Sequence, residues 1–280
     1  MALPRLVDIA KGNVSSYHDR FEGKPDKDKS KVNELKAGLA FSINMEINVL
    51  YKILNEKGHF KNRFEICAES NNMTLDEFSR LHSDKQDELI CAGMNYPNKV
   101  YGIRRVDFSN RYEKGLRLYY LALNMGTSAG RQEYGKCCVI TRPLLDIALK
   151  YDSLKHYYND KNEFDEKTCH NDLVPYDSIE LLLSDKFSDE IAVADVDEVK
   201  RAIDKDTDPV EIMTTALINS SNIEVVVMLK KDYVGILELD RKKRRGESLN
   251  NKDKEDVQYL NDLQHELRIR GIELKILGEV

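Results

Sequence analysis

The chain has 280 residues, of which 41% are apolar and 33% are charged, so it can bury a core in one large or two small domains and is neither disordered nor fibrous. Its 43 basic and 49 acidic residues give a formal charge of −6 and are mostly interspersed. This balance argues against nonspecific nucleic-acid binding through net charge, because no broad positive field is available to hold a phosphate backbone.

The sequence carries no sign of a membrane segment or a metal site. The N-terminus lacks the apolar region of a secretory signal, and no later stretch approaches the roughly 18 apolar residues that span a bilayer. The five cysteines are odd in number and lack C-x-x-C spacing, which favours reduced thiols over disulfides or zinc. We therefore expect a cytoplasmic protein, or one delivered into a target cell by an unrecognised route, without a membrane partner or a metal.

The first third of the chain, residues 1–95, is predicted to be a helical region. Residues 1–20 read as a short arm and 22–32 as an exposed polar loop. Apolar residues at three- or four-residue spacing predict a buried helix over 33–56. Capping-box patterns at Thr74 to Glu77 and Ser83 to Gln86 predict two short helices.

After Pro97 the apolar pattern changes to short runs rich in β-branched or aromatic residues. These runs predict strands over 100–108, 116–123, 136–141, 179–183, 190–193, 224–229, 234–239 and 272–277. Helices are predicted over 143–151, 196–203, 209–219 and 253–270.

Strands follow one another as often as they alternate with helices, which favours an α+β fold over a regular parallel sheet. The expected architecture is a split, mainly antiparallel sheet with flanking helices. Residues 96–240 are predicted to form the mixed core, and residues 241–280 a C-terminal helix and strand packed on it.

One carboxylate stands at the start of a predicted strand. Glu180 precedes three leucines, and a strand end can hold a charge rigidly beside a cleft. Arg104 and Arg105 lie on another predicted strand, where alternation sends one guanidinium to each face. One of the two arginines is then able to face a cleft, whichever register the strand adopts.

The order of several motifs resembles the C-terminal half of ADP-ribosyltransferase-fold toxins, including DarT-like DNA-modifying toxins and abortive-infection proteins. The resemblance extends over residues 100–234. It rests on these runs in chain order: Tyr134-Gly135-Lys136 before a strand, Arg142 to Leu145, His156-Tyr157-Tyr158, Ile179 to Leu182, and Asp189 to Val193.

This resemblance implies an enzyme that binds NAD as a substrate and transfers ADP-ribose to a macromolecular acceptor, with nucleic acid as a partner only if it is modified. Cleaving the nicotinamide bond passes through an oxocarbenium-like state that a carboxylate stabilises while a cation holds the diphosphate. The implied catalytic residues are Glu180, Arg104 and Ser128. The implied NAD-binding residues are Arg105, Tyr134 and Tyr119. Alternatively the first half of the site lies at Tyr17-His18, in which case the arginine assignment fails.

Two other functions stay open on the sequence. The first is a non-enzymatic binding or inhibitory protein of the phage or effector type, which acts by protein contact. The second is a metal-dependent nuclease that uses Glu273 and Lys275 of a Glu-x-Lys strand, with Glu238 or Asp240 as the preceding acid and magnesium as the metal. The basic run Arg241 to Arg245 is either a nucleic-acid contact or a solvated loop.

Overall fold

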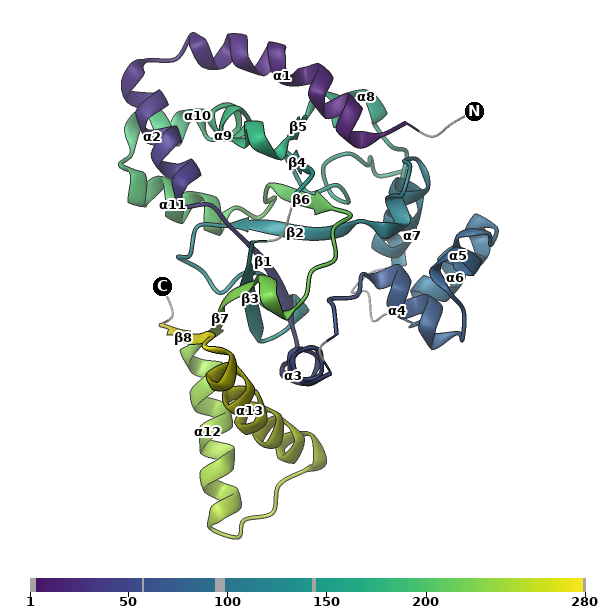
Figure 1. Cartoon of the computed structure of the whole chain (residues 1–280), viewed down its shortest axis with the longest axis vertical. Coiled ribbons are helices and arrows are strands. Elements are labelled where there is room, and N and C mark those ends of the chain that lie inside the picture. The colour runs from purple at the N-terminus through teal and green to yellow at the C-terminus, as the bar shows by residue number, and fades with distance from the viewer. Residues whose placement is uncertain (1–3, 57, 94–98, 143–144, 279–280) are drawn as a thin grey trace. The chain divides into compact units, whose positions relative to one another are not determined.

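The computed structural model describes residues 4–56, 58–93, 99–142 and 145–278. The fold is α+β with a helical N-terminal region, as the sequence predicts (Figure 1). The chain divides into two compact units, each built from separated segments. Unit 1 comprises Met1–Leu39, Lys61–Leu123 and Leu144–Ala216, and unit 2 comprises Ala40–Phe60, Asn124–Pro143 and Leu217–Val280. This division differs from the three consecutive ranges expected from the sequence.

Unit 1 combines an antiparallel sheet of order β5-β4-β6-β2 with helices. Its strands are β2 (Tyr119–Asn124), β4 (Ile147–Leu149), β5 (Leu173–Pro175) and β6 (Glu211–Thr214). Its helices are α1 (Leu6–Glu22), α2 (Asp26–Ala37), α4 (Arg63–Ser70), α5 (Leu75–Ser79), α6 (Ser83–Gly93), α7 (Lys99–Asn110), α8 (Glu166–Asn171), α9 (Ile179–Lys186), α10 (Ser188–Val193) and α11 (Val196–Lys205). Short 3-10 turns lie at Gly115–Arg117 and Tyr176–Ser178.

The N-terminal segment belongs to the core of unit 1, so the prediction of a free arm was wrong. In α1 the buried side chains are Leu6, Ala10 and Tyr17, whose spacings of four and seven residues place them on one helix face. Leu6 and Ala10 join a buried cluster with Ile147 and Leu149 of β4. The apolar face is sparse among polar residues, which explains why the helix was missed. The predicted polar loop likewise forms most of α2.

Unit 2 contains four further strands, which pair in the order β1-β3-β7-β8. Its strands are β1 (Ala40–Met45), β3 (Cys137–Thr141), β7 (Ile223–Leu229) and β8 (Glu273–Leu277). Its helices are α3 (Ile47–Asn55), α12 (Lys230–Arg244) and α13 (Asn251–Arg270), with 3-10 turns at Gln132–Tyr134 and Ser220–Asn222. The β1–β3 and β3–β7 pairs are antiparallel, whereas β7 and β8 are parallel and are joined through the α12–α13 hairpin. A parallel pair requires such a long crossover connection.

Four predicted strands are confirmed, namely those that overlap β2, β3, β7 and β8. Four others, over 100–108, 179–183, 190–193 and 234–239, are wrong because these residues lie in α7, α9, α10 and α12. A short apolar run does not distinguish a buried strand from a buried helix. In α9 the residues Ile179, Leu181, Leu182 and Leu183 are all buried, which makes the helix apolar on more than one face.

The predicted helices met mixed outcomes. Those over 196–203 and 253–270 are confirmed by α11 and α13. The single helix expected over 33–56 is divided, because β1 separates α2 from α3. The helix predicted over 209–219 contains β6, and within 143–151 the described residues include β4, while 143 and 144 lie outside the described residues. Strand pairing overrides helical spacing at these positions.

The loop between β2 and β3 closes on the end of β1 within unit 2. The Asn44 side chain donates to the carbonyls of Ala129 (3.0 Å) and Gly135 (3.2 Å) and accepts from the Arg131 amide (2.7 Å). Gly135 has φ of +144°, and a Cβ at this position would lie 2.1 Å from the Met45 carbonyl carbon. The small residues of this loop therefore permit a close approach to the protein's own backbone.

We expect Gly135→Ala to destabilise the protein by about 2 kcal/mol or more, because the added methyl meets backbone atoms that cannot rotate away. The matched control is Gly235→Ala in α12, where a Cβ meets nothing within 4 Å and helix propensity favours alanine by about 0.5–1 kcal/mol. Urea unfolding measures both variants. Equal midpoints for Gly135→Ala and the wild type would contradict the packing described here.

Candidate functional site

A buried ion pair lies beneath a polar network in unit 1. Arg105 of α7 places its Nη2 3.2 Å from Oε1 of Glu211 at the start of β6, and the two side chains are only 10% and 9% exposed. The guanidinium also donates to the Ser153 hydroxyl (3.1 Å) and lies 3.6 Å from the Tyr120 ring centroid. Burial raises the pKa of Glu211, and the charge of Arg105 opposes that rise.

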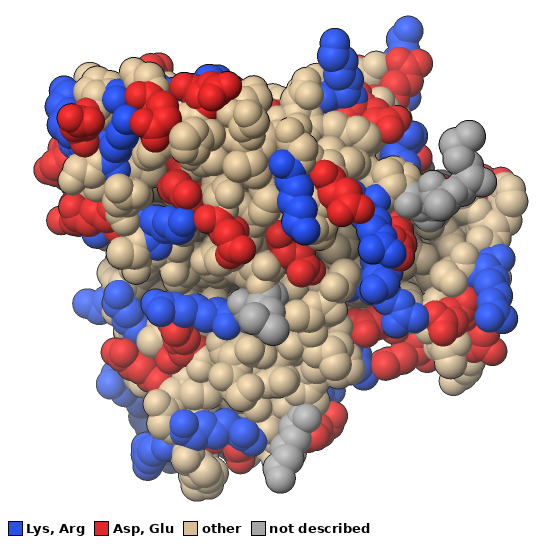
Figure 2. Space-filling view, turned by 45° about the horizontal axis from the view of Figure 1, so that its top comes forward, with Lys and Arg blue, Asp and Glu red and all other residues tan. Residues whose placement is uncertain are grey.

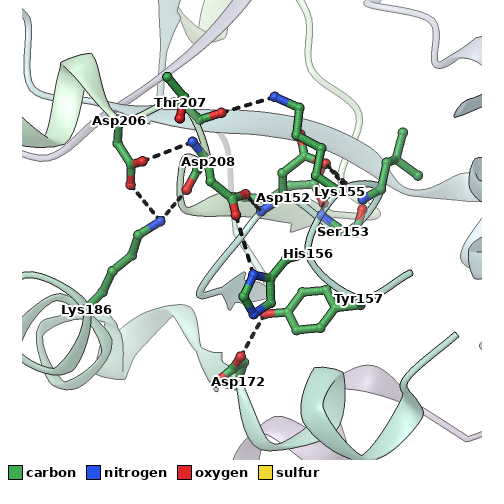
Figure 3. A network of polar contacts seen from close by, with 12 residues as sticks. Asp152, Ser153, Lys155, His156, Tyr157, Asp172, Lys186, Asp206, Thr207 and Asp208 are labelled. Carbon is green, nitrogen blue, oxygen red and sulfur yellow. Dashed lines mark hydrogen bonds and ion pairs between the residues drawn. The ribbon is translucent and has the colours of Figure 1, made fainter. Parts of the chain in front are cut away.

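Carboxylates from the segment before and within β6 fix the loop that follows β4 (Figure 3). Glu211 accepts a hydrogen bond from the Ser153 amide (3.2 Å), and Asp208 accepts one from the Asp152 amide (2.7 Å). Asp152 in turn accepts from the Leu154 amide (2.8 Å) and turns the chain back on itself. The loop is therefore held rigidly although it has little regular structure.

Aromatic rings stack along this loop. The ring centroids of Tyr151 and His156 are 4.0 Å apart in a stacked arrangement, and Nδ1 of His156 lies 3.6 Å from Oδ2 of Asp208. The Tyr157 hydroxyl donates to Asp172 (3.0 Å), in a place where burial raises the pKa of both groups. The Tyr151 ring is therefore held in place, with the imidazole of His156 stacked on it.

Lys186, the last residue of α9, adds a cation beside the same tyrosine ring. Its Nζ lies 2.8 Å from Oδ2 of Asp206 and 4.4 Å from the Tyr151 ring centroid, and it donates to the Asp208 carbonyl. The lysine side chain is 5% exposed. Burial lowers the pKa of Lys186, and its ion pair with Asp206 opposes that effect.

A cavity of about 280 Å³ opens beside these groups. It is formed by Tyr151, by the junction of α9 and α10, and by the C-terminal end of α11. Its lining residues are Tyr151, Lys186, Phe187, Glu190, Ala202, Lys205 and Asp206. Within the described ranges, neither Glu190 nor Lys205 has an ion-pair partner, so a carboxylate and an ammonium group are available to a ligand.

The residues predicted to be catalytic lie elsewhere. Glu180 is in the first turn of α9, not on a strand, and its Oε2 lies 2.7 Å from Nζ of Lys36. Arg104 is on α7 and donates to the carbonyls of Leu154 (2.8 Å) and Asn159 (3.0 Å). The Ser128 hydroxyl, in unit 2, accepts from the Gly130 amide (3.2 Å). None of the three lines the cavity.

The residues predicted to bind NAD also have other positions. Arg105 forms the buried pair with Glu211, so both predicted arginines hold the loop after β4. The Tyr119 hydroxyl donates to Glu65 (3.1 Å). Tyr134, in the turn before β3 of unit 2, is 44% exposed. The structure thus brings Arg104 and Arg105 to one loop but does not gather the predicted set around one cavity.

Sequence reasoning missed the lining residues Tyr151, Lys186 and Lys205. Glu190 stood inside a run used for the resemblance, Asp189 to Val193, and at the start of another predicted strand, but the catalytic role was assigned to Glu180. Only the packing of α10 against α11 brings Glu190 and Lys205 to one cavity, and short-range spacing carries no signal for it.

The nuclease arrangement does not form as predicted. Glu273 and Lys275 do lie on a strand, β8, but Glu238 and Asp240 are on helix α12, where Asp240 pairs with Arg244 (2.7 Å). β8 pairs with β7, which offers only Glu224 as an acid. Over residues 4–56, 58–93, 99–142 and 145–278, no three His, Cys, Asp or Glu side chains cluster in a way that would hold a metal.

The chain matches no protein-family profile and no curated protein sequence with which it was compared. Among its described helices, none has the length and apolar character needed to cross a membrane. The candidate site therefore stands on its own geometry.

We expect Arg105→Met to destabilise the protein by about 3–5 kcal/mol near pH 8, because the carboxylate of Glu211 stays buried without its cation. Loss of the cation raises the pKa of Glu211 further. A carboxyl whose folded-state pKa is raised contributes stability below its usual pKa of about 4.3 and loses it as pH rises through the folded-state value. The deficit should therefore shrink as pH falls from 8 toward 5.

Urea unfolding at the two pH values measures this effect. Arg104→Met is the matched control. The Arg104 guanidinium contacts two backbone carbonyls and the side-chain amide of Asn162, so the loss of stability in this variant should be the same at both pH values. The double variant Arg105→Met with Glu211→Gln should recover roughly half of the loss at pH 8. A deficit in Arg105→Met that does not depend on pH would refute the role given to Glu211.

Proposed function

We propose that unit 1 is a nucleotide-binding unit whose cavity beside α9 and α11 takes the nicotinamide end of NAD, and that the protein is an ADP-ribosyltransferase-like enzyme acting on a macromolecular acceptor. The observation that carries the proposal is the composition of one cavity: two carboxylates, two ammonium groups and two aromatic rings line it together, and one carboxylate, Asp206, is paired with Lys186. These are the groups that the chemistry of NAD cleavage requires.

The proposal moves the catalytic carboxylate from Glu180 to Glu190. Glu180 is engaged by Lys36, whereas Glu190 faces the cavity and lies in the same run that supports the family resemblance. Tyr151 supplies a fixed wall of the cavity, because its ring is held by the stacked ring of His156 and by the ammonium of Lys186 at 4.4 Å.

The cavity is open to solvent, and its size limits which part of a ligand fits in it. At about 280 Å³ it falls just below the range of about 300–1,000 Å³ typical of pockets for drug-sized ligands. A nicotinamide with its ribose matches that scale, and the remaining nucleotide of NAD would extend outside. Lys205 at the C-terminal end of α11 is the cation assigned to the diphosphate, since Lys186 is already paired with Asp206.

The chemical step assigns one role to each group. The bond from the ribose C1′ to the nicotinamide nitrogen breaks, and its electron pair leaves with neutral nicotinamide. The carboxylate of Glu190 stabilises the positive charge that develops on the ribose. An acceptor nucleophile, or water in its absence, then forms the new bond to C1′ and releases its proton to Glu190 or to solvent.

Nicotinamide release from NAD by the purified protein tests this function. Glu190→Gln should lower kcat/KM by about 100-fold or more, as expected for the loss of an electrostatic partner of the transition state. Lys205→Met should raise KM by about tenfold with a smaller change in kcat, because it contributes to binding.

The matched control is Glu180→Gln, which removes an exposed ion pair worth at most about 1 kcal/mol and should leave kcat/KM within about twofold of wild type. Circular dichroism verifies folding of each variant. Loss of activity in Glu180→Gln with full activity in Glu190→Gln would overturn the assignment. A wild type that neither binds NAD calorimetrically nor releases nicotinamide would overturn the function.

A further inference from the structure

The α12–α13 hairpin of unit 2 ends in a dense group of cations, independent of the cavity in unit 1. α12 is a 15-residue helix with Ile236 as its buried residue, and its last turn contains Arg241, Lys242, Lys243 and Arg244, followed by Arg245. We call these five residues the basic turn. Every residue from Arg241 to Ser248 is exposed.

The basic turn projects beyond the packed part of the hairpin. α12 begins directly after β7, and a rise of about 1.5 Å per residue places its C-terminal end about 22 Å from that strand (Figure 1). Packing of α12 ends earlier, because Leu237, Leu239 and Asp240 are half-buried and every residue of the helix from Arg241 on is exposed. Since the Debye length is about 8 Å in physiological salt, the acidic residues of the sheet region barely affect the field at this tip.

Helix stability does not account for five adjacent cations. One or two basic side chains complement the partial negative charge of a helix C-terminus, as Arg268 and Arg270 do in α13. Additional cations repel one another, and Arg241 and Arg245 form a like-charged pair four residues apart. Successive residues lie about 100° apart, so the basic turn presents positive charge on every side of the helix.

Intramolecular ion pairs engage only part of this charge. Arg244 pairs with Asp240 (2.7 Å) and Arg245 with Glu247 (2.8 Å). Arg241, Lys242 and Lys243 have no ion-pair partner among the described residues. On the face drawn in Figure 2, by contrast, basic and acidic side chains are interspersed.

We propose that the basic turn of α12 is a docking surface for the phosphate backbone of a nucleic acid. Closely spaced cations on an exposed helix end match closely spaced phosphates and release their counterions on binding. An anionic membrane is less well matched, because Arg241–Ser248 contains no apolar side chain to enter a bilayer, and Leu249 is buried. The contacts are to phosphate, so binding depends on salt and not on base sequence.

Fluorescence polarisation with a labelled 20-base-pair DNA duplex and a labelled 20-nucleotide RNA, from 50 to 200 mM salt, tests the surface. The triple variant Arg241→Gln, Lys242→Gln, Lys243→Gln should bind at least tenfold more weakly at 50 mM salt. The slope of log affinity against log salt for the duplex should fall in magnitude by roughly 2 to 3, as three phosphate contacts are lost. Glutamine preserves helix propensity, and the unfolding midpoint should not fall.

The matched control is Lys27→Gln, Lys167→Gln, Arg201→Gln, which changes net charge equally at three exposed positions of unit 1. It should bind within about twofold of wild type. Equal weakening by the two triple variants would show a general charge effect and overturn the proposal, as would a wild type that binds neither probe at 50 mM salt. Tighter binding to phosphatidylserine vesicles or polyglutamate than to either probe would also contradict it.

Discussion

The buried contact between Arg105 and Glu211 is the constraint on which the arrangement of unit 1 depends. It joins helix α7 to strand β6, and through Ser153 it holds the loop after β4. Desolvating two charges is costly, and the pair persists because each partner makes additional hydrogen bonds. Arg104 holds the same loop from the neighbouring position on α7. Tyr151 at the start of that loop then becomes a fixed wall for the cavity that Glu190 and Lys205 also line.

Parts of the fold were predictable because local composition was sufficient. The β-branched runs of β3 and β7, bounded by polar residues, could hardly form anything but strands, and the interrupted order of elements indicated an α+β class. The apolar run of α9 was assigned to a strand because a short helix buried on several sides has no amphipathic period. Similarly, α1 buries only three side chains along 17 residues, too few to stand out from a polar background.

None of the residues predicted for the site lines the cavity of unit 1. The family resemblance implied that a carboxylate, a cation and an aromatic ring act together, and residues of these three types line that cavity. It could not indicate which residues, because Tyr151, Glu190 and Lys205 are separated by long stretches of chain and meet only through packing. Arg105 was chosen for its charge and adjacency to a predicted cleft, yet its burial beside Glu211 gives it a positioning role.

The methyl group of Ala202, a lining residue of the cavity, provides the most direct test of the central claim that this cavity binds a nucleotide. With alanine methyls labelled with ¹³C, addition of NAD should shift the Ala202 resonance in a saturable manner. The resonance of Ala10, buried in the core of the same unit, should stay unchanged. A shift at Ala202 without one at Ala10 is the predicted result, and an Ala202 resonance unmoved by millimolar NAD would contradict the account.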